Sequence, residues 1–164
     1  MTLRPILRWP DPRLAQVCAP VDDVKSVRTL AQDMLETMYA APGRGLAAPQ
    51  VGELVRLFVM DTSGADAPPA PMICINPSIT NVDSPLVEMD EGCLSIPGIR
   101  VSVPRPSRVA LHFADGFGTQ HDMQLDGFAA LCAQHELDHL NGIVTLDRIN
   151  QNDRSRLIAE YEAQ

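Results

Sequence analysis

The 164-residue sequence has no apolar run approaching 18 residues, so it offers no segment long enough to cross a bilayer as a helix. Its first residues, Met1 through Pro5, lack the apolar core of a signal peptide and the basic, acid-poor extension of a transit peptide. The four cysteines are scattered without the spacing of a disulfide framework, which favours a reducing compartment. We therefore expect a cytoplasmic protein without membrane contact.

Positive charge is also scarce. Thirteen Lys and Arg stand against 21 Asp and Glu, which gives a formal net charge of −8, and no basic cluster interrupts this balance. Nucleic-acid-binding domains usually carry a basic patch that neutralises phosphates. Nucleic acid is therefore not an expected partner.

No internal repeat and no linker-like stretch divides the chain, so we expect one domain over residues 1–164. Helical periodicity covers 24–41, and a short helix is expected near 151–162. Strand-like segments bounded by Pro or Gly occupy 53–61, 71–76, 86–91, 99–103, 107–114 and 118–125. This mixture predicts an α+β fold in which mixed or antiparallel sheets surround a buried central helix.

That central helix is predicted near 127–140. Asp126-Gly127 is a candidate N-cap, and Asn141-Gly142 is a typical C-terminal stop. Outside one polar motif nearly every residue between these ends is apolar, which is typical of a buried helix. Burying the two His, one Glu and one Asp of the motif is costly unless each has a partner, and a metal ion with polar neighbours would satisfy them together.

The polar motif is His135-Glu136-Leu137-Asp138-His139, an HExxH pattern. On a helix, histidines four residues apart share one face, about 6 Å apart along the axis, so both rings can bind one metal ion. Glu136 is rotated by about 100°, but its side chain can reach a water molecule beside that ion, which makes it a candidate general base. The alternative, a chance match on a solvated helix, is disfavoured by the apolar surroundings.

A catalytic metal site of this kind needs a third protein ligand. Cys132 lies three residues before His135 on the same face. The metal is expected near the level of residue 137, however, about 7.5 Å further along the axis, and the Cβ of Cys132 points away from it. Cys132 is therefore interpreted as a small buried wall residue.

The best candidate for a third ligand from another segment is Cys93, in Glu91-Gly92-Cys93-Leu94-Ser95. Gly92 permits close approach of the backbone, and the stretch has extended character. This evidence places Cys93 only modestly ahead of the histidines outside the motif. The residues that stay open as ligands are the acids, Cys18, Cys74, His112 and His121.

The segment Gly43–Gln50 formally fits the dinucleotide fingerprint G-x-G-x-x-A. That fingerprint has meaning only between a strand and the start of a helix. Here a helical pattern ends near Ala41, and Pro49 disfavours a helix starting at Ala48, so we reject nucleotide binding. Two interpretations remain: a tight glycine turn before the next strand, or a turn whose exposed backbone pairs with an extended peptide.

Three separated blocks together resemble the peptide deformylase family. They are Gly43–Gln50 (GRGLAAPQ), Glu91–Ser95 (EGCLS) and Gln134–Leu140 (QHELDHL), and the similarity extends from about residue 3 to about residue 149. The resemblance implies a metal-dependent amide hydrolase that removes the formyl group from the N-terminal formyl-methionine of newly made polypeptides. It also implies the residue roles. The metal ligands would be Cys93, His135 and His139; the acid/base Glu136; and the oxyanion donors the Gln50 side-chain amide and the Leu94 backbone N–H.

The resemblance favours one Fe²⁺ ion, although an imidazole–imidazole–thiolate set also suits Zn²⁺, Ni²⁺ or Co²⁺. By position, the substrate-binding residues would be Arg44, Gly45, Met89, Gly92, Phe128, Leu131 and Cys132, with core packing as the alternative for the apolar ones. Arg44 departs from the family, which usually has an aliphatic residue there, so substrate preference is in question. Arg105 is a candidate partner for Glu91 or Asp138, with an exposed surface charge as the alternative.

The expected partners are formyl-methionyl nascent peptides, and we expect a monomer. Some relatives dock on the ribosome through a cationic C-terminal helix, but residues 150–164 hold two Arg against three acids, so docking is not indicated. Three alternatives stay open. The first is a deformylase-like paralogue with altered substrate, suggested by Arg44. The second is a non-catalytic binder of formylated or acetylated N-termini. The third is a zinc endopeptidase, which shares HExxH but usually takes a third His or Glu.

Overall fold

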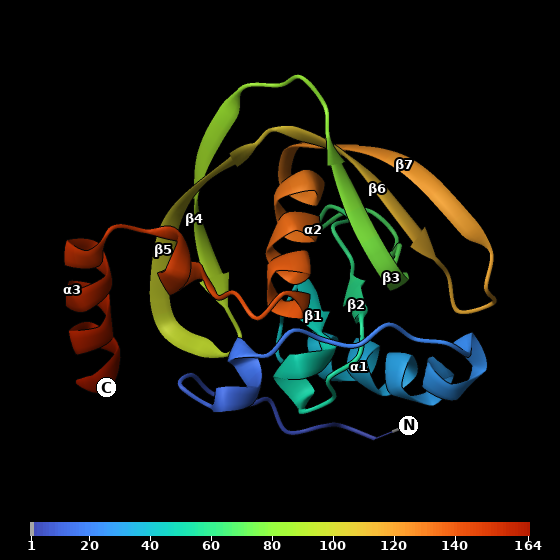
Figure 1. Cartoon of the computed structure of the whole chain (residues 1–164), viewed down its shortest axis with the longest axis horizontal. Coiled ribbons are helices and arrows are strands. Elements are labelled where there is room, and N and C mark those ends of the chain that lie inside the picture. Colours follow the sequence, from blue (N-terminus) through green and yellow to red (C-terminus); the bar gives the residue numbers. More distant parts are fainter. Residues whose placement is uncertain (1) are drawn as a thin grey trace.

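The computed structural model describes residues 2–164 and has the predicted α+β architecture (Figure 1). The helices are α1 (Arg28–Ala40), α2 (Gly127–Leu140) and α3 (Gln151–Glu162). The strands are β1 (Gly45–Ala47), β2 (Leu57–Met60), β3 (Met72–Asn81), β4 (Leu86–Cys93), β5 (Ile96–Pro106), β6 (Arg108–Ala114) and β7 (Gln120–Asp126). Short 3₁₀ turns are η1 (Pro12–Ala15), η2 (Val24–Val27), η3 (Ala48–Val51) and η4 (Thr145–Arg148). Within residues 2–164, no helix combines the length and apolarity needed to cross a membrane.

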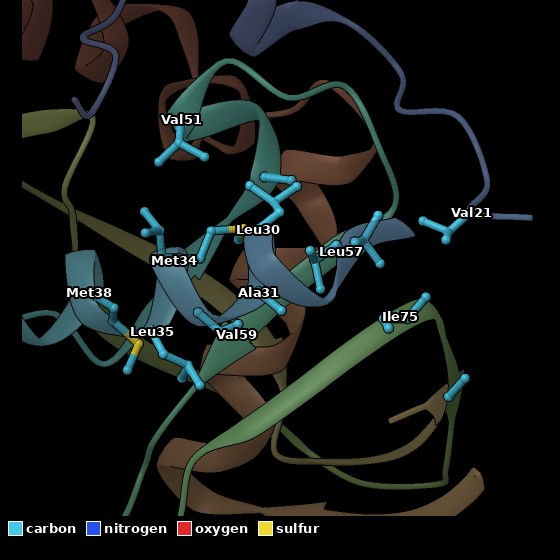
Figure 2. Packing of buried hydrophobic residues seen from close by; sticks show 14 residues of the cluster. Val21, Leu30, Ala31, Met34, Leu35, Met38, Val51, Leu57, Val59 and Ile75 are labelled. Atoms are coloured by element: carbon cyan, nitrogen blue, oxygen red, sulfur yellow. The ribbon is translucent and has the colours of Figure 1, made fainter. Parts of the chain in front are cut away.

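Five antiparallel strands form the larger sheet, in the order β1-β2-β3-β6-β7. Alternate side chains of a strand point to opposite faces, and β2 shows the consequence. Leu57 and Val59 pack with α1, whereas Phe58 and Met60 pack with the cluster that includes α2. Figure 2 shows the α1 side of this arrangement, where Leu57 and Val59 of β2 belong to the same cluster as the buried residues of α1. The two helices therefore cover opposite faces of one sheet.

The second sheet contains only β4 and β5. From Ile99 to Arg105 every second residue of β5 is buried, and Val101 and Val103 pack against Leu146 of η4 and Leu157 of α3. Figure 1 shows α2 standing between this two-stranded sheet and the five-stranded one. The buried central helix that the sequence predicts is confirmed, and it is covered from both sides.

The ends of α2 agree with the predicted range, but its N-cap works differently. Asn141 and Gly142 follow the helix as expected, and Gly142 has a φ of 73°, in the left-handed region that favours glycine. Asp126 occupies the N-cap position, yet its side chain accepts no hydrogen bond from the first turn. The prediction of an Asp126 side-chain cap is therefore wrong.

Strand β3 continues past the point where the sequence suggested a stop, because Asn76-Pro77 forms a bulge instead of a turn. The register with β6 shifts between Ile75 and Ser78, and Asn76 has a φ of 50°. The Asn76 amide bonds both backbone groups of Val21, at 2.8 Å each. These two bonds hold the irregular residue, so the strand resumes and runs to Asn81.

Candidate active site

The structure brings Cys93 to the two histidines of α2. A register shift between Gly92 and Cys93 ends the regular pairing of β4 with β5, and such bulges re-aim a side chain. One candidate ligand atom from each of Cys93, His135 and His139 lies within 4.8 Å of the others, and Cys93 Sγ is 3.4 Å from His139 Nε2. Across residues 2–164 no other group of three metal-ligating side chains gathers in this way.

The other histidines lie elsewhere. His112 on β6 pairs with Asp122, and His121 on β7 pairs with Asp115 at 2.8 Å. Cys132 lies on α2, where its Sγ donates to the backbone oxygen of Arg44 at 3.6 Å. Among the alternatives that the sequence left open, the geometry therefore favours Cys93 as the third member of the cluster.

The donor set fits a divalent cation. His135 Nδ1 lies 2.9 Å from Glu91 Oε2, so this ring nitrogen is engaged and Nε2 is left for a metal. Burial lowers the pKa of His139 well below its usual value, which keeps the ring neutral, as ligation requires. Burial also lowers the pKa of His135, but hydrogen bonds with Cys93 and Glu91 outweigh it and raise the pKa well above the usual value. Negative charge that favours a proton on His135 favours a cation at the same place.

A buried ionic chain braces His135. Arg105 donates to both oxygens of Glu91, with Nη2 3.0 Å from Oε2, and to Asp138 Oδ2, also at 3.0 Å. Of the two interpretations left open for Arg105, the structure shows the ion pair, and it is made with both acids. Burial raises the pKa of Glu91, but its bonds with His135 and Arg105 lower it overall, so Glu91 is ionised.

Arg148 completes this chain and was missed by sequence reasoning. It comes from η4, and its Nε lies 3.0 Å from Asp138 Oδ2. Two arginines, Arg105 and Arg148, therefore neutralise two carboxylates behind the candidate metal ligands. Each buried charge in this arrangement has partners of opposite sign. No local pattern signals Arg148, because its role depends on the turn that folds back after α2.

Glu136 lies buried beneath the edge strand β1. A Cβ atom added to Gly45 would lie 2.3 Å from Glu136 Oε1, so only glycine lets the strand cross at this distance. Burial raises the pKa of Glu136 to about 7. A carboxyl group with this pKa can take up and return a proton near neutral pH. Glu136 Oε2 is buried without a hydrogen-bond partner among residues 2–164.

Gln50 is oriented by hydrogen bonds at both ends of its amide. Its Oε1 accepts from Ala47 N at 2.8 Å, and its Nε2 donates to Ser95 Oγ at 3.1 Å and lies 3.7 Å from Cys93 Sγ. The side chain is almost fully buried. The amide N–H group is therefore held beside Cys93.

A cleft of about 820 Å³ opens over the cluster. It is lined by all seven residues expected to bind substrate, namely Arg44, Gly45, Met89, Gly92, Phe128, Leu131 and Cys132, and by Gln50, Cys93, Leu94, His135 and Glu136. His139 lies buried behind this lining. Sequence reasoning missed Ile99 and Arg100 of β5 and Pro42. The volume of this cleft and its apolar walls suit the binding of a short peptide.

Comparisons with known proteins agree along nearly the whole chain. The family described as polypeptide deformylase matches residues 3–155. Peptide deformylases from Cellvibrio japonicus and Acinetobacter baumannii are 46% and 45% identical over 163 residues, which is 99% of this chain and 95% and 92% of theirs.

Solved structures give the same result. The crystal structure of a peptide deformylase from Legionella pneumophila aligns with a TM-score of 0.91 and 37% identity, covering 99% of this chain and 95% of that one. The Ehrlichia chaffeensis peptide deformylase in complex with actinonin aligns with a TM-score of 0.90 and 38% identity, covering 99% and 98%.

Proposed function

The chain belongs to the polypeptide deformylase family and is a hydrolase that removes the N-terminal formyl group of polypeptides, and we propose that it does so in the cleft above Cys93, His135 and His139. The observation that carries this proposal is the convergence of one thiol and two imidazoles beside a buried carboxyl group. The zinc-endopeptidase and binder alternatives are not favoured, because the whole-chain similarity is to deformylases.

Cys93 Sγ and the two ring nitrogens would hold one divalent cation. When bound, such a cation polarises the formyl oxygen and lowers the pKa of water. Two imidazoles and a thiolate suit several first-row metals, so availability in the cell matters. We propose Fe²⁺ as the physiological ion, with Zn²⁺, Ni²⁺ and Co²⁺ as substitutes.

Glu136 then acts as the general base and general acid. Its carboxylate accepts a proton from the attacking water, whose oxygen forms a bond to the formyl carbon. The same carboxyl group returns the proton to the departing amine as the C–N bond breaks, leaving formate and a free N-terminus. Negative charge on the formyl oxygen would be stabilised by the Gln50 N–H and the Leu94 backbone N–H. One such donor typically contributes on the order of 3 kcal/mol to the barrier.

The peptide would lie extended along the free edge of β1. Among residues 2–164 this strand pairs only with β2, so one edge remains available for strand addition, and Gly45 lines the cleft. The methionine side chain would enter the apolar walls formed by Met89, Phe128, Leu131 and Cys132. Because Gly45 presses on Glu136, there is little room beside the reacting carbon, which favours formyl over larger acyl groups.

We propose that the protein acts as a single-domain monomer in the cytoplasm on formyl-methionyl nascent peptides. Ribosome docking through α3 is not part of this proposal. Both arginines of α3 are already paired with acids of the same chain: Arg154 with Asp147, and Arg156 with Asp153 and Glu160.

The test is formate release from a formyl-methionyl tripeptide by metal-loaded protein, beside an internally quenched peptide for endopeptidase activity. We expect one formate per free amine and no internal cleavage. Glu136→Ala should retain the metal and lose turnover by a factor on the order of 10² or more, since it removes the acid/base. Full activity of this variant would overturn the role of Glu136, and binding of the tripeptide without formate would favour a non-catalytic binder.

A further inference from the structure

Arg44 is a cleft residue whose backbone is fixed by hydrogen bonds on both sides. The preceding Gly43 donates its N–H to Met38 O at 2.9 Å, and Arg44 O accepts from Asp61 N at 2.9 Å. The residue lines the cleft, and its side chain is exposed. The residue is therefore held beside the cleft, and its exposed guanidinium group lies close to Ser63.

No carboxylate neutralises Arg44 among residues 2–164. Its side chain donates to the backbone oxygen of Ser63, which is uncharged and leaves other N–H groups free. Asp61, its backbone partner, is buried, and each of its oxygens already accepts two bonds. Oδ1 accepts from the N–H and hydroxyl of Ser63, and Oδ2 from the Tyr39 hydroxyl at 2.6 Å and the Ala70 N–H at 3.2 Å.

The other charges of the cleft do not cancel this one. Glu91 is bound to Arg105, and Glu136 is buried on the floor. On the β4–β5 wall Asp90 and Arg100 are both exposed, and neither forms an ion pair among residues 2–164; Arg100 donates to the Asp90 backbone oxygen at 3.3 Å, so this wall carries one charge of each sign. A protein of net charge −8 thus places an uncompensated cation beside the path of its peptide substrate.

We propose that Arg44 determines substrate preference by attracting formyl-methionyl peptides that carry a carboxylate side chain at the second or third residue. The proposal rests on the proposed function, because a peptide extended along β1 passes Arg44 just after its methionine enters the cleft. The contact is exposed to solvent, so it resembles a surface ion pair, which corresponds to a factor of about two to five.

The test compares formyl-Met-Ala-Ser with peptides in which the second or third residue is Glu, Gln or Lys. At low salt the wild-type protein should show a kcat/KM for a Glu peptide about two to five times that of its Gln counterpart, with Lys lowest. The difference should lie in KM, because Arg44 does not touch the reacting atoms, and it should shrink in high salt. Arg44→Gln should abolish the difference, and Arg44→Lys should retain part of it.

Arg28→Gln is the matched control. Arg28 is an exposed arginine whose guanidinium donates to Gly116 O at 2.7 Å and does not line the cleft. Equal turnover of Glu and Gln peptides by the wild type, or an unchanged preference in Arg44→Gln, would overturn the proposal. So would an equal loss on every peptide in that variant, which indicates a structural role. Failure to release formate from any peptide would instead overturn the proposed function itself.

Discussion

Replacing Glu91 with Gln tests how the ionic chain holds the metal cluster. Glu91 Oε2 accepts from both Arg105 Nη2, at 3.0 Å, and His135 Nδ1, at 2.9 Å, whereas Oε1 accepts only from Arg105 Nε. An amide has one oxygen. The amide oxygen of the introduced Gln is best placed at the former Oε2 position, where it accepts from both donors. The amide NH₂ group then occupies the Oε1 position, so Arg105 Nε faces an N–H group and loses its acceptor.

This geometry sets the expected magnitudes. One charge-assisted hydrogen bond is lost, which costs about 1.5–3 kcal/mol of folding stability in the metal-free protein. Arg105 keeps Asp138 as a partner, so the larger penalty of a fully uncompensated buried charge does not apply. His135 now faces a neutral amide in place of a carboxylate. Changes of this kind lower metal affinity by roughly 10- to 100-fold, or about 1.4–2.7 kcal/mol.

The assay is competition for Zn²⁺ against a chromogenic chelator, together with unfolding of the metal-free protein. Glu88→Gln is the control, since Glu88 lies on the same strand but is exposed, and its carboxylate meets only Ser102 Oγ, at 3.4 Å. We expect Glu88→Gln to match the wild type in both measurements. A Glu91→Gln variant with wild-type metal affinity would refute the reasoning that Glu91 orients His135.

Two further substitutions test separate parts of the structure. Gly45→Ala places a Cβ atom 2.3 Å from Glu136 Oε1, so the Glu136 side chain must move. We expect kcat to fall about 100-fold while the circular dichroism spectrum is unchanged. A near-normal kcat would contradict the close approach of Gly45 to Glu136. Burial raises the pKa of Asp61, but hydrogen bonds from Tyr39, Ser63 and Ala70 lower it overall to about 2. Because the folded pKa lies below the ordinary 3.8, this stabilisation is complete above about pH 4 and is lost as the pH falls toward 2. Asp61→Asn should therefore cost about 2 kcal/mol at pH 7 and flatten the slope of the unfolding free energy between pH 4 and 2.

Much of the fold follows from local chemistry. The apolar character of 127–140, with Asn141-Gly142 after it, predicts a buried helix with the observed range. Pro and Gly around 99–103 mark a strand-like segment, and β5 covers this range, with Val101 and Val103 buried. These features depend on side-chain period and on capping, both of which are visible in a single segment.

Other features depend on segments distant in the sequence. β1 has three residues and is followed directly by η3, so only its pairing with β2 makes it a strand. β3 continues past Pro77 because the Asn76 amide bonds Val21, a residue far away along the chain. Arg148 joins the ionic chain of Glu91, Arg105 and Asp138 only because η4 turns back toward Asp138. Such contacts leave no mark on local periodicity.

The candidate site divides in the same way. The HExxH spacing places His135 and His139 on one helical face, and this part required only helix geometry. Choosing Cys93 over His112 or His121 required tertiary structure or the family resemblance, because a Cys after a Gly is weak evidence alone. The bond from the Arg44 side chain to Ser63 O could not be predicted, because it depends on the course of the loop after β2.

Titration of the metal-free protein with Co²⁺, followed by absorbance, tests whether Cys93 is a metal ligand. We expect one Co²⁺ per chain with a thiolate-to-cobalt charge-transfer band that persists in Cys132→Ser and disappears in Cys93→Ser. The same band at full intensity without the Cys93 thiol, or its loss with Cys132 alone, would contradict the proposed metal site.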